Sequence, residues 1–280
     1  MGQNKIKILV ACHKPTDVYE DDVYIPIHVG RATSKFKREM QHMIGDDTGD
    51  NISAKNPYYC ELTAQYWGWK NLKNIEYIGL CHYRRFFQTK ITVNNIDSIL
   101  GNKYDALCVS PLHERINVAH RLILATCLED YQIFMHCVKK VQPQYFETVK
   151  HFFSRGVVIP YNMFVMKKTL FDNFAEWQFS ILTEMENYIR LSGYSRARRL
   201  YGYYAEMLLP IYLKYNHKKI RFDNWSSMIE GKANNVTMKN IIYPLNDILL
   251  KINRMGLKLD APAVLVGFQI DGINIGKVNQ

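Results

Sequence analysis

The sequence has no apolar run long enough to cross a membrane, since none approaches the ~18 residues that such a helix needs. Its opening residues, MGQNKIKILVACHKP, hold only a short apolar stretch typical of a strand, so we expect no secretory signal peptide. Gly2 is followed by Gln, Asn, Lys and Ile6, where a myristoylation signal has Ser or Thr at the sixth position. We therefore expect a cytoplasmic protein.

Cysteine pairs and several common catalytic motifs are also missing. The six cysteines form no C-x-x-C pair and lie in apolar or aromatic surroundings, so we interpret them as reduced core residues. No G-x-G-x-x-G, G-x-x-x-x-G-K-[ST], G-x-S-x-G or H-E-x-x-H motif occurs. Dinucleotide, P-loop, serine-hydrolase and zinc-protease chemistry therefore lose their usual support.

What is present is a basic, aromatic-rich globular composition. Hydrophobic residues make up 48% of the 280 residues and charged residues 22%, which excludes a wholly disordered or fibrous chain. The 19 Tyr, 13 Phe and 4 Trp accompany a formal net charge of +10, which favours an anionic partner such as a nucleotide, a phosphate-bearing lipid or a nucleic acid. Basic and aromatic residues do not alternate as RNA-stacking surfaces require, and no nucleic-acid-binding module is recognised, so we expect no nucleic-acid partner.

Strand-like and helix-like segments alternate along the chain. Short apolar runs rich in β-branched residues predict buried strands at 5–12, 75–82, 103–111 and 156–166, with an edge strand at 220–222. Loops are predicted from the first strand to about residue 27 and over 44–57. Helices are predicted from Asn56 to Leu72, over most of 119–153 with a break at Gln142-Pro143, over 170–192 and over 202–216. This alternation predicts an α/β fold with a mostly parallel sheet flanked by helices.

The chain contains no internal repeat and no low-complexity linker. We therefore predict one domain over residues 1–225 and a C-terminal extension over 226–280 that packs on the same domain.

An acidic loop lies within residues 44–57. Asp46, Asp47 and Asp50 follow one another so closely that a folded loop needs a cation, a basic side chain or ligand hydroxyls beside them. The loop is either a solvated turn or a loop that grips the ribose and base of a nucleotide through Asn and Ser side chains.

Four polar residues, His82, Tyr83, Arg84 and Arg85, come directly after a predicted buried strand. Ligands of α/β proteins bind at the carboxyl ends of parallel strands, and arginines bind phosphate oxygens in pairs of hydrogen bonds. Apolar residues flank the four on both sides, so we favour an anion site over a salt-bridged strand end. Arg84 and Arg85 cannot both face one pocket if the strand continues through them.

Glu206 is the single acid between Glu186 and Asp223, on an otherwise apolar helix. It is either a partly desolvated carboxylate suited to a general base or an acid paired with a nearby arginine. All other charged residues of the surrounding segment 190–221 are Lys or Arg. This segment forms either a solvated face or a peripheral contact with anionic lipid at the inner membrane face.

Aromatic faces also pack against the apolar side of sugar rings. We expect most aromatics in the core, and the candidates for sugar or acceptor contact are those beside the motifs: Tyr66, Trp67, Tyr161 and Tyr203.

Six segments together resemble a known family. They are IKILVACHKP, IPIHVGRA, IGDDTGDNISAKNPYYCELTAQYWGWKN, YIGLCHYRRFF, the YNMFVMKKTLFDNFAEW block and GYYAEMLLPIYL, and they span roughly residues 5–215. In these segments the chain resembles a family of bacterial glycosyltransferases of capsule and exopolysaccharide synthesis, long catalogued as a domain of unknown function. Members include galactosyl- and galactofuranosyltransferase-like enzymes.

The resemblance implies a GT-A-like, Rossmann-related fold that transfers a hexose, galactose or galactofuranose, from a UDP-sugar. The acceptor would be a glycan or a polyprenyl-linked oligosaccharide. It places His82, Tyr83, Arg84 and Arg85 at the diphosphate and makes Glu206 the acceptor base, with inversion at the sugar. The residues implied at the nucleotide or donor sugar are Ala11, Cys12, His13, Gly30, Asp50, Asn51, Ile52, Ser53, Lys55, Asn162 and Met163.

One departure from ordinary GT-A enzymes concerns metal. Those enzymes carry D-x-D where this chain has His82-Tyr83-Arg84. A guanidinium neutralises a departing diphosphate without coordination geometry, so we expect no required cofactor. A divalent metal such as manganese, held by His82 and an Asp of 46–50, stays an alternative. A non-catalytic protein that binds nucleotide sugars or glycans on the same scaffold is the rival function.

Overall fold

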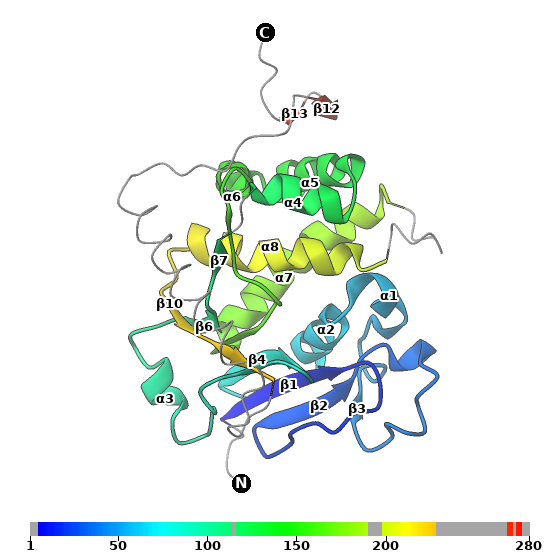
Figure 1. The fold of residues 1–280 in the computed structure, drawn as a ribbon, viewed down its shortest axis with the longest axis vertical. Helices are drawn as coiled ribbons and strands as arrows, with labels where there is room; N and C mark the ends of the chain where they lie inside the picture. Colours follow the sequence, from blue (N-terminus) through cyan, green and yellow to red (C-terminus); the bar gives the residue numbers. More distant parts are fainter. Residues whose placement is uncertain (1–4, 114–115, 190–197, 228–267, 271–272, 276–280) are drawn as a thin grey trace. The chain divides into compact units, whose positions relative to one another are not determined.

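The computed structural model describes residues 5–113, 116–189, 198–227, 268–270 and 273–275 (Figure 1). The chain divides into two compact units. The first, here called the sheet unit, comprises Met1–Ser110, Pro160–Glu176 and His217–Asn234. The second, the helical unit, comprises Pro111–Ile159, Trp177–Asn216 and Asn235–Gln280.

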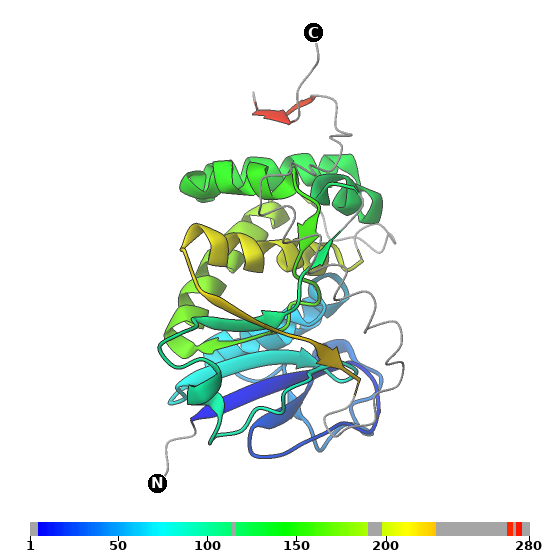
Figure 2. The same cartoon turned by 60° about the vertical axis from the view of Figure 1, so that its left-hand side comes forward.

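A seven-stranded sheet forms the centre of the sheet unit, in the order β10-β6-β9-β4-β1-β2-β3 (Figure 2). Neighbouring strands are parallel except β9, which runs antiparallel to both β4 and β6. The predicted α/β fold with a mostly parallel sheet is therefore confirmed. The strands are β1 Ile6–Cys12, β2 Tyr24–His28, β3 Ile44–Gly45, β4 Tyr77–His82, β6 Ala106–Val109, β9 Phe164–Lys167 and β10 Ile220–Asp223.

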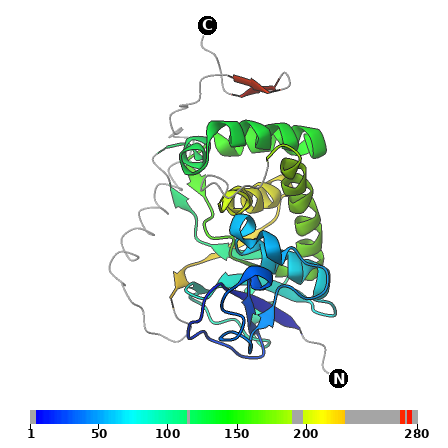
Figure 3. The same ribbon diagram turned by 90° about the vertical axis from the view of Figure 1, so that its right-hand side faces the viewer.

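Helices cover one face of this sheet. α1 (Asn56–Tyr59) leads into α2 (Leu62–Asn71), which packs on β1 (Figures 1 and 3). The close approach depends on Gly68, where a Cβ would lie only 2.9 Å from a methyl of Leu9. The first half of α7 (Lys168–Glu186) contributes Phe171, whose ring stacks at 5.6 Å on Phe164 of β9.

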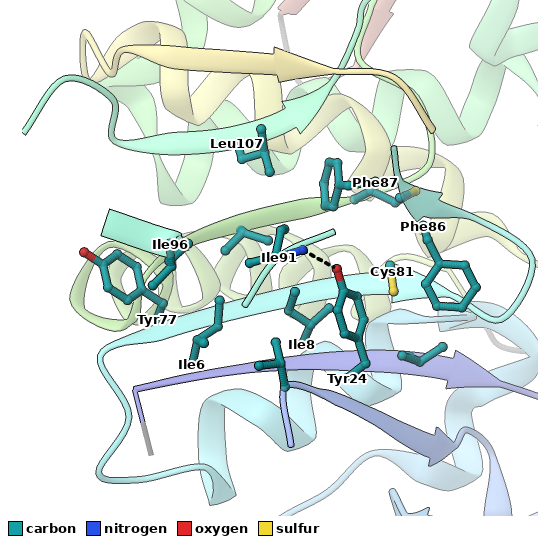
Figure 4. Close-up of a cluster of buried hydrophobic side chains, with 14 of the residues drawn as sticks. Ile6, Ile8, Tyr24, Tyr77, Cys81, Phe86, Phe87, Ile91, Ile96 and Leu107 are labelled. Carbon is teal, nitrogen blue, oxygen red and sulfur yellow. Dashed lines mark hydrogen bonds between the residues drawn. The ribbon is translucent and has the colours of Figure 1, made fainter. Parts of the chain in front are cut away.

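The opposite face carries a buried cluster under the segment between β4 and β6 (Figure 4). Alternate residues of β1, among them Ile6 and Ile8, point into it, as the two-residue period of a strand dictates. Tyr24 is fully buried there, and its hydroxyl accepts a hydrogen bond from the backbone N–H of Ile91 at 3.1 Å. The same segment holds β5 (Phe86–Phe87) and α3 (Ile96–Ile99), and β5 pairs antiparallel with β11 (Trp225–Ser226).

The helical unit contains a pair of short antiparallel strands far apart in the chain, the second half of α7 and the remaining long helices. α4 packs on α5, α6 and α8, and α6 packs on α8. Phe134 lies at its centre, with its ring 5.6 Å from that of Phe153 and 4.8 Å from that of Tyr204. The elements are α4 Val118–Ala125, α5 Leu128–Val141, the 3₁₀ helix η3 Pro143–Tyr145, α6 Phe146–Phe153 and α8 Leu200–Tyr215, with β7 Leu112–His113 antiparallel to β8 Val157–Val158.

Three sequence expectations were wrong in detail. The loop predicted to about residue 27 contains most of β2, a short strand with Pro26 in its middle. The helix predicted from Asn56 to Leu72 breaks at Cys60, whose φ of 53° is left-handed. The strand predicted over 156–166 splits into β8 and β9, with a turn at Tyr161 and Asn162 between them.

The predicted C-terminal extension lies almost wholly outside the described residues. Within it, β12 (Phe268–Ile270) pairs antiparallel with β13 (Ile273–Ile275). The domain boundary at residue 225 therefore stays a prediction. Among the described residues, no helix is long and apolar enough to span a membrane.

Candidate functional site

The carboxyl edge of the sheet gathers most of the predicted site. The ends of β1, β2 and β4 lie side by side there, because Ala11 pairs with His82 and Cys12 pairs with His28. β9 runs the other way, so its beginning lies at the same edge, with Phe164 opposite Leu80. The register thus brings the turn before β9 next to the turn after β4.

The chain reverses immediately after β4. The backbone N–H of Arg85 donates to the carbonyl of His82 at 2.9 Å, and the N–H of His82 donates back to the carbonyl of Arg85 at 3.2 Å. This turn sends the chain into β5, so the strand does not continue through the two arginines. Arg84 is exposed, with its guanidinium 5.0 Å from the ring of Tyr83, whereas Arg85 is half-buried.

Arg85 sits against two aromatic rings, which we call the aromatic clamp: Tyr161 and Trp225. The guanidinium carbon lies 4.2 Å from the Tyr161 ring centre and 5.5 Å from that of Trp225, and the two rings meet edge to face. Its Nε is buried without a hydrogen-bond partner, and no carboxylate of the described residues pairs with it. The clamp holds the cation by cation–π attraction, which leaves its N–H groups for an anion.

The turn before β9 is fixed by two side chains. His82 Nε2 donates to the backbone carbonyl of Tyr161 at 2.6 Å, since a carbonyl only accepts, and a neutral His82 would leave Nδ1 as an acceptor. Asn162 Nδ2 donates to Glu61 Oε1 at 2.7 Å. Tyr161 and Asn162 both have positive φ, 76° and 50°, so these two bonds hold a backbone that non-glycine residues rarely adopt.

The acidic loop is organised around Asp46, which is fully buried. Its Oδ2 accepts from the backbone N–H of Gly30 at 2.7 Å, and its Oδ1 accepts from the N–H of Arg31 and from the hydroxyl of Ser53. Ser53 Oγ in turn accepts from the N–H of Ala32. Asp46 and Ser53 therefore join the 3₁₀ helices η1 (Arg31–Thr33) and η2 (Ser53–Lys55), and the hydroxyl of Ser53 is used within the protein.

Replacing Asp46 by alanine should destabilise the sheet unit by ~3 kcal/mol or more, because two N–H groups and a hydroxyl lose their acceptor in a buried place. Chemical denaturation followed by circular dichroism would measure the loss. The matched control is Asp47→Ala, since the half-buried Asp47 makes a 3.5 Å ion pair with Arg31 and, among the described residues, accepts no hydrogen bond. Equal stability of the two variants would contradict the role assigned to Asp46.

Helix α2 anchors the outer part of the same loop. Trp67 is 8% exposed, and its indole N–H donates to Thr48 Oγ1 at 2.9 Å. Tyr66 is half-buried, and its hydroxyl donates to Asp50 Oδ1 at 3.1 Å. Burial, and then this hydrogen bond to a carboxylate, raise the pKa of the Tyr66 hydroxyl, which stays protonated. Trp67 is thus a packing residue of the loop, and Tyr66 is the more accessible of the two predicted sugar contacts.

The other residues predicted at the donor differ in accessibility. Ala11, Cys12 and Met163 are buried, so only their backbone can reach a ligand, and burial raises the pKa of the Cys12 thiol to about 12. His13 is exposed, with its ring 5.3 Å from that of Tyr83. Gly30 has a φ of 68°, and a Cβ there would lie 2.7 Å from the side chain of Asn56. Asp50 is exposed, and Asn51, Ile52 and Lys55 are half-buried.

Tyr203 and Glu206 belong to α8 of the helical unit, and both are half-buried. The guanidinium of Arg199, which precedes α8, lies 5.3 Å from the Tyr203 ring. The part of these residues in a site at the sheet stays a prediction. Of the basic segment 190–221, Arg190 and Arg196 lie outside the described residues.

Sequence reasoning missed Glu61, Asp46 as a structural centre, and Trp225. A signal existed for Glu61, because it is a lone acid in an apolar helix, the pattern that singled out Glu206. Nothing in the sequence marked Trp225, since only the pairing of β11 with β5 brings it to Arg85. Within the described parts of the chain, no three His, Cys, Asp or Glu side chains gather closely enough to hold a metal ion.

The chain matches, over residues 7–218, the model of the family described as "Domain of unknown function (DUF4422)", and it belongs to this family. Among solved structures it is similar to the apo structure of WbbM, a bifunctional glycosyltransferase, with 28% identity and a TM-score of 0.68. The match covers 83% of this chain and 48% of WbbM, so the chain spans about half the length of that enzyme. No curated protein matches the chain. The predicted resemblance and the glycosyltransferase-like fold are confirmed.

Proposed function

We propose that the protein is a glycosyltransferase that transfers a hexose, galactose or galactofuranose, from a UDP-sugar. The proposed acceptor is a glycan or a polyprenyl-linked oligosaccharide of capsule or exopolysaccharide synthesis. Support comes from the similarity to a bifunctional glycosyltransferase and from the site at the carboxyl edge of the sheet.

The observation that carries the proposal is Arg85 in its aromatic clamp. A half-buried guanidinium that no carboxylate in the described part of the chain pairs with, at the edge where α/β sheets bind ligands, suits a diphosphate. Negative charge develops on UDP as the bond to the sugar breaks, and a prepositioned cation stabilises that charge most in the transition state. Exposed Arg84 and half-buried His82 complete the polar turn around this group.

The nucleotide would lie along the same edge. His13 follows β1 at this edge and is exposed. Asn51 is half-buried, and its Oδ1 accepts from the N–H of Ser53, which Asp46 joins to the turn at Gly30. Asp50 is the exposed residue that precedes Asn51 in the same loop. Tyr66 offers a ring face beside Asp50 for a sugar or base. Glu206 would take the proton from the acceptor hydroxyl, which attacks opposite the leaving UDP and inverts the anomeric centre, with Tyr203 one turn away on α8.

A donor screen tests this function. Thermal unfolding would be recorded with UDP, GDP, CMP and their sugar conjugates, followed by UDP release from UDP-galactose and UDP-galactofuranose with a glycan acceptor. A shift with UDP compounds together with acceptor-dependent UDP release is expected. Binding without turnover on any donor would instead favour the non-catalytic rival, and a response to GDP or CMP alone would contradict the UDP donor.

The reaction is expected to proceed without a bound metal, because Arg85 supplies the positive charge that D-x-D enzymes obtain from a cation. Dialysis against a chelator should leave the rate of UDP release within about twofold of the untreated enzyme. The measurement is repeated after adding manganese. Full loss of activity that manganese restores would contradict this expectation and point to His82 as a ligand.

A cytoplasmic location with peripheral contact at the inner membrane face fits a polyprenyl-linked acceptor. Of the described basic residues in segment 190–221, Lys214 and Lys219 are exposed and suit anionic headgroups.

A further inference from the structure

Glu61 is a carboxylate in an unusual position. Glu61 is only 9% exposed, yet no lysine or arginine of the described residues forms an ion pair with it. It occupies the N-cap position of α2 without capping the helix through its side chain. A buried acid without a cation is costly to keep, and such groups concentrate at functional sites.

The pair formed by Glu61 and Asn162 presents two hydrogen-bond acceptors. Glu61 Oε1 is occupied by the amide N–H of Asn162 at 2.7 Å. The described residues offer no hydrogen-bond partner to Glu61 Oε2 or to Asn162 Oδ1, and neither atom is among the fully buried polar atoms. Both therefore stay able to accept hydrogen bonds from a ligand.

Tyr161 connects the pair of Glu61 and Asn162 to the proposed diphosphate site. Asn162 follows Tyr161, whose carbonyl accepts from His82 and whose ring packs on Arg85. The carboxyl edge of the sheet thus carries a cationic group and, directly next to it in the chain, a pair of acceptors. In a nucleotide sugar, the diphosphate is likewise followed directly by a ring of hydroxyl groups. A carboxylate binds hydroxyl donors through strong charge-assisted hydrogen bonds and repels a second anion.

We propose that Glu61 and Asn162 form the subsite that binds hydroxyl groups of the donor sugar. The proposal rests on the proposed function, since it takes a sugar diphosphate as the ligand. It assigns Arg85 to the diphosphate and Glu61 with Asn162 to the sugar. It predicts that Glu61 distinguishes a UDP-sugar from UDP, whereas Arg85 binds both.

The test compares wild type with Glu61→Gln, which keeps the shape and the bond from Asn162 but replaces the free carboxylate oxygen. Titration calorimetry would measure the affinity for UDP, for UDP-galactose or UDP-galactofuranose, whichever the wild type binds, and for its monodeoxy forms. We expect UDP affinity to stay within about twofold. Affinity for the sugar nucleotide should fall ~10- to 100-fold, the range for a hydrogen bond to a charged group.

The deoxy sugars supply a readout that a structural role would not change. Wild type should discriminate against one monodeoxy form, and Glu61→Gln should lose that discrimination. Asn162→Gly, which keeps the left-handed backbone, should behave in the same direction, and Glu76→Gln at an exposed acid is the control. Thermal midpoints establish that each variant is folded.

The possible failures differ. If wild-type protein does not bind UDP, the proposed function is overturned. If it binds UDP but neither galactose nucleotide, the proposed hexose and the subsite as stated are both wrong. If Glu61→Gln weakens UDP and UDP-sugar equally, or keeps the wild-type discrimination among deoxy forms, the subsite alone is overturned and Glu61 supports the turn before β9.

Discussion

Arg85→Ala should lower kcat/KM for the sugar nucleotide by ~10²- to 10³-fold, the range found when a prepositioned donor to a developing anion is removed. The reason is that Arg85 is the guanidinium held by the aromatic clamp and lacks a carboxylate partner among the described residues. Affinity for UDP alone should fall as well, because the diphosphate is present in both ligands. Initial rates of UDP release and calorimetry with UDP measure the two effects.

Arg84→Ala is the matched control, since it removes the neighbouring guanidinium of the same turn. Arg84 is exposed, and its guanidinium lies 5.0 Å from the ring of Tyr83, so its loss should cost less than about tenfold in kcat/KM. Arg85→Lys should recover only part of the activity because an ammonium group lacks the planar fork of donors. Equal losses in Arg84→Ala and Arg85→Ala would show that the clamp does not select Arg85.

Glu206→Gln should lower kcat by ~10²-fold or more while donor affinity is preserved, because an amide cannot take the proton of the acceptor hydroxyl. The defect should be confined to transfer, so slow hydrolysis of the donor without acceptor should continue. Steady-state rates with and without acceptor, together with calorimetry for the donor, separate the two steps.

The matched control for this variant is Glu184→Gln in the same helical unit. Half-buried Glu184 forms a 2.7 Å ion pair with the more exposed Lys140, and this pair lowers the pKa of Glu184. Its loss should leave kcat unchanged, since Glu184 accepts hydrogen bonds from Lys140 and Asn187 and neither belongs to the proposed site. If Glu206→Gln retains full activity at an unchanged thermal midpoint, Glu206 is a structural residue and the base lies elsewhere.

The central strands were predictable because burial on both faces leaves a continuous apolar run, as in the YIGLCH of β4. β2 was missed because its five residues include Pro26, which normally argues against a strand inside a sheet. The turn at Tyr161 was missed because its apolar surroundings argued for a strand. The residues from 156 to 166 are almost all apolar, so the pattern predicts one strand, and only bonds to His82 and Glu61 reveal why the chain bends there.

The polar turn at Arg84 and Arg85 was predictable, because polar residues interrupt an apolar run there, and its part in a site stays a prediction. Sequence alone could not rank the two arginines, because that ranking depends on Tyr161 and Trp225 arriving from distant parts of the chain. The sequence also suggested that Ser53 binds a ligand. Its hydroxyl already donates a buried hydrogen bond to Asp46, so it is poorly placed to bind one. Whether the polar atoms of a side chain are already hydrogen-bonded within the protein depends on the tertiary structure and cannot be predicted from sequence alone.

The place of β9 between β4 and β6 has a consequence for how the protein folds as it is synthesised. β1, β2 and β4 can associate once residue 82 has emerged from the ribosome. The next strand of the sheet, β9, pairs with β4 at Leu80 and with β6 at Cys108, and both pairings need Phe164. All of Pro111–Ile159 leaves the ribosome in between. Contacts of such long sequence separation form slowly and leave strand edges open meanwhile. Trp225 is synthesised later still, so Arg85 acquires its second aromatic neighbour only after β9 and α8 have left the ribosome.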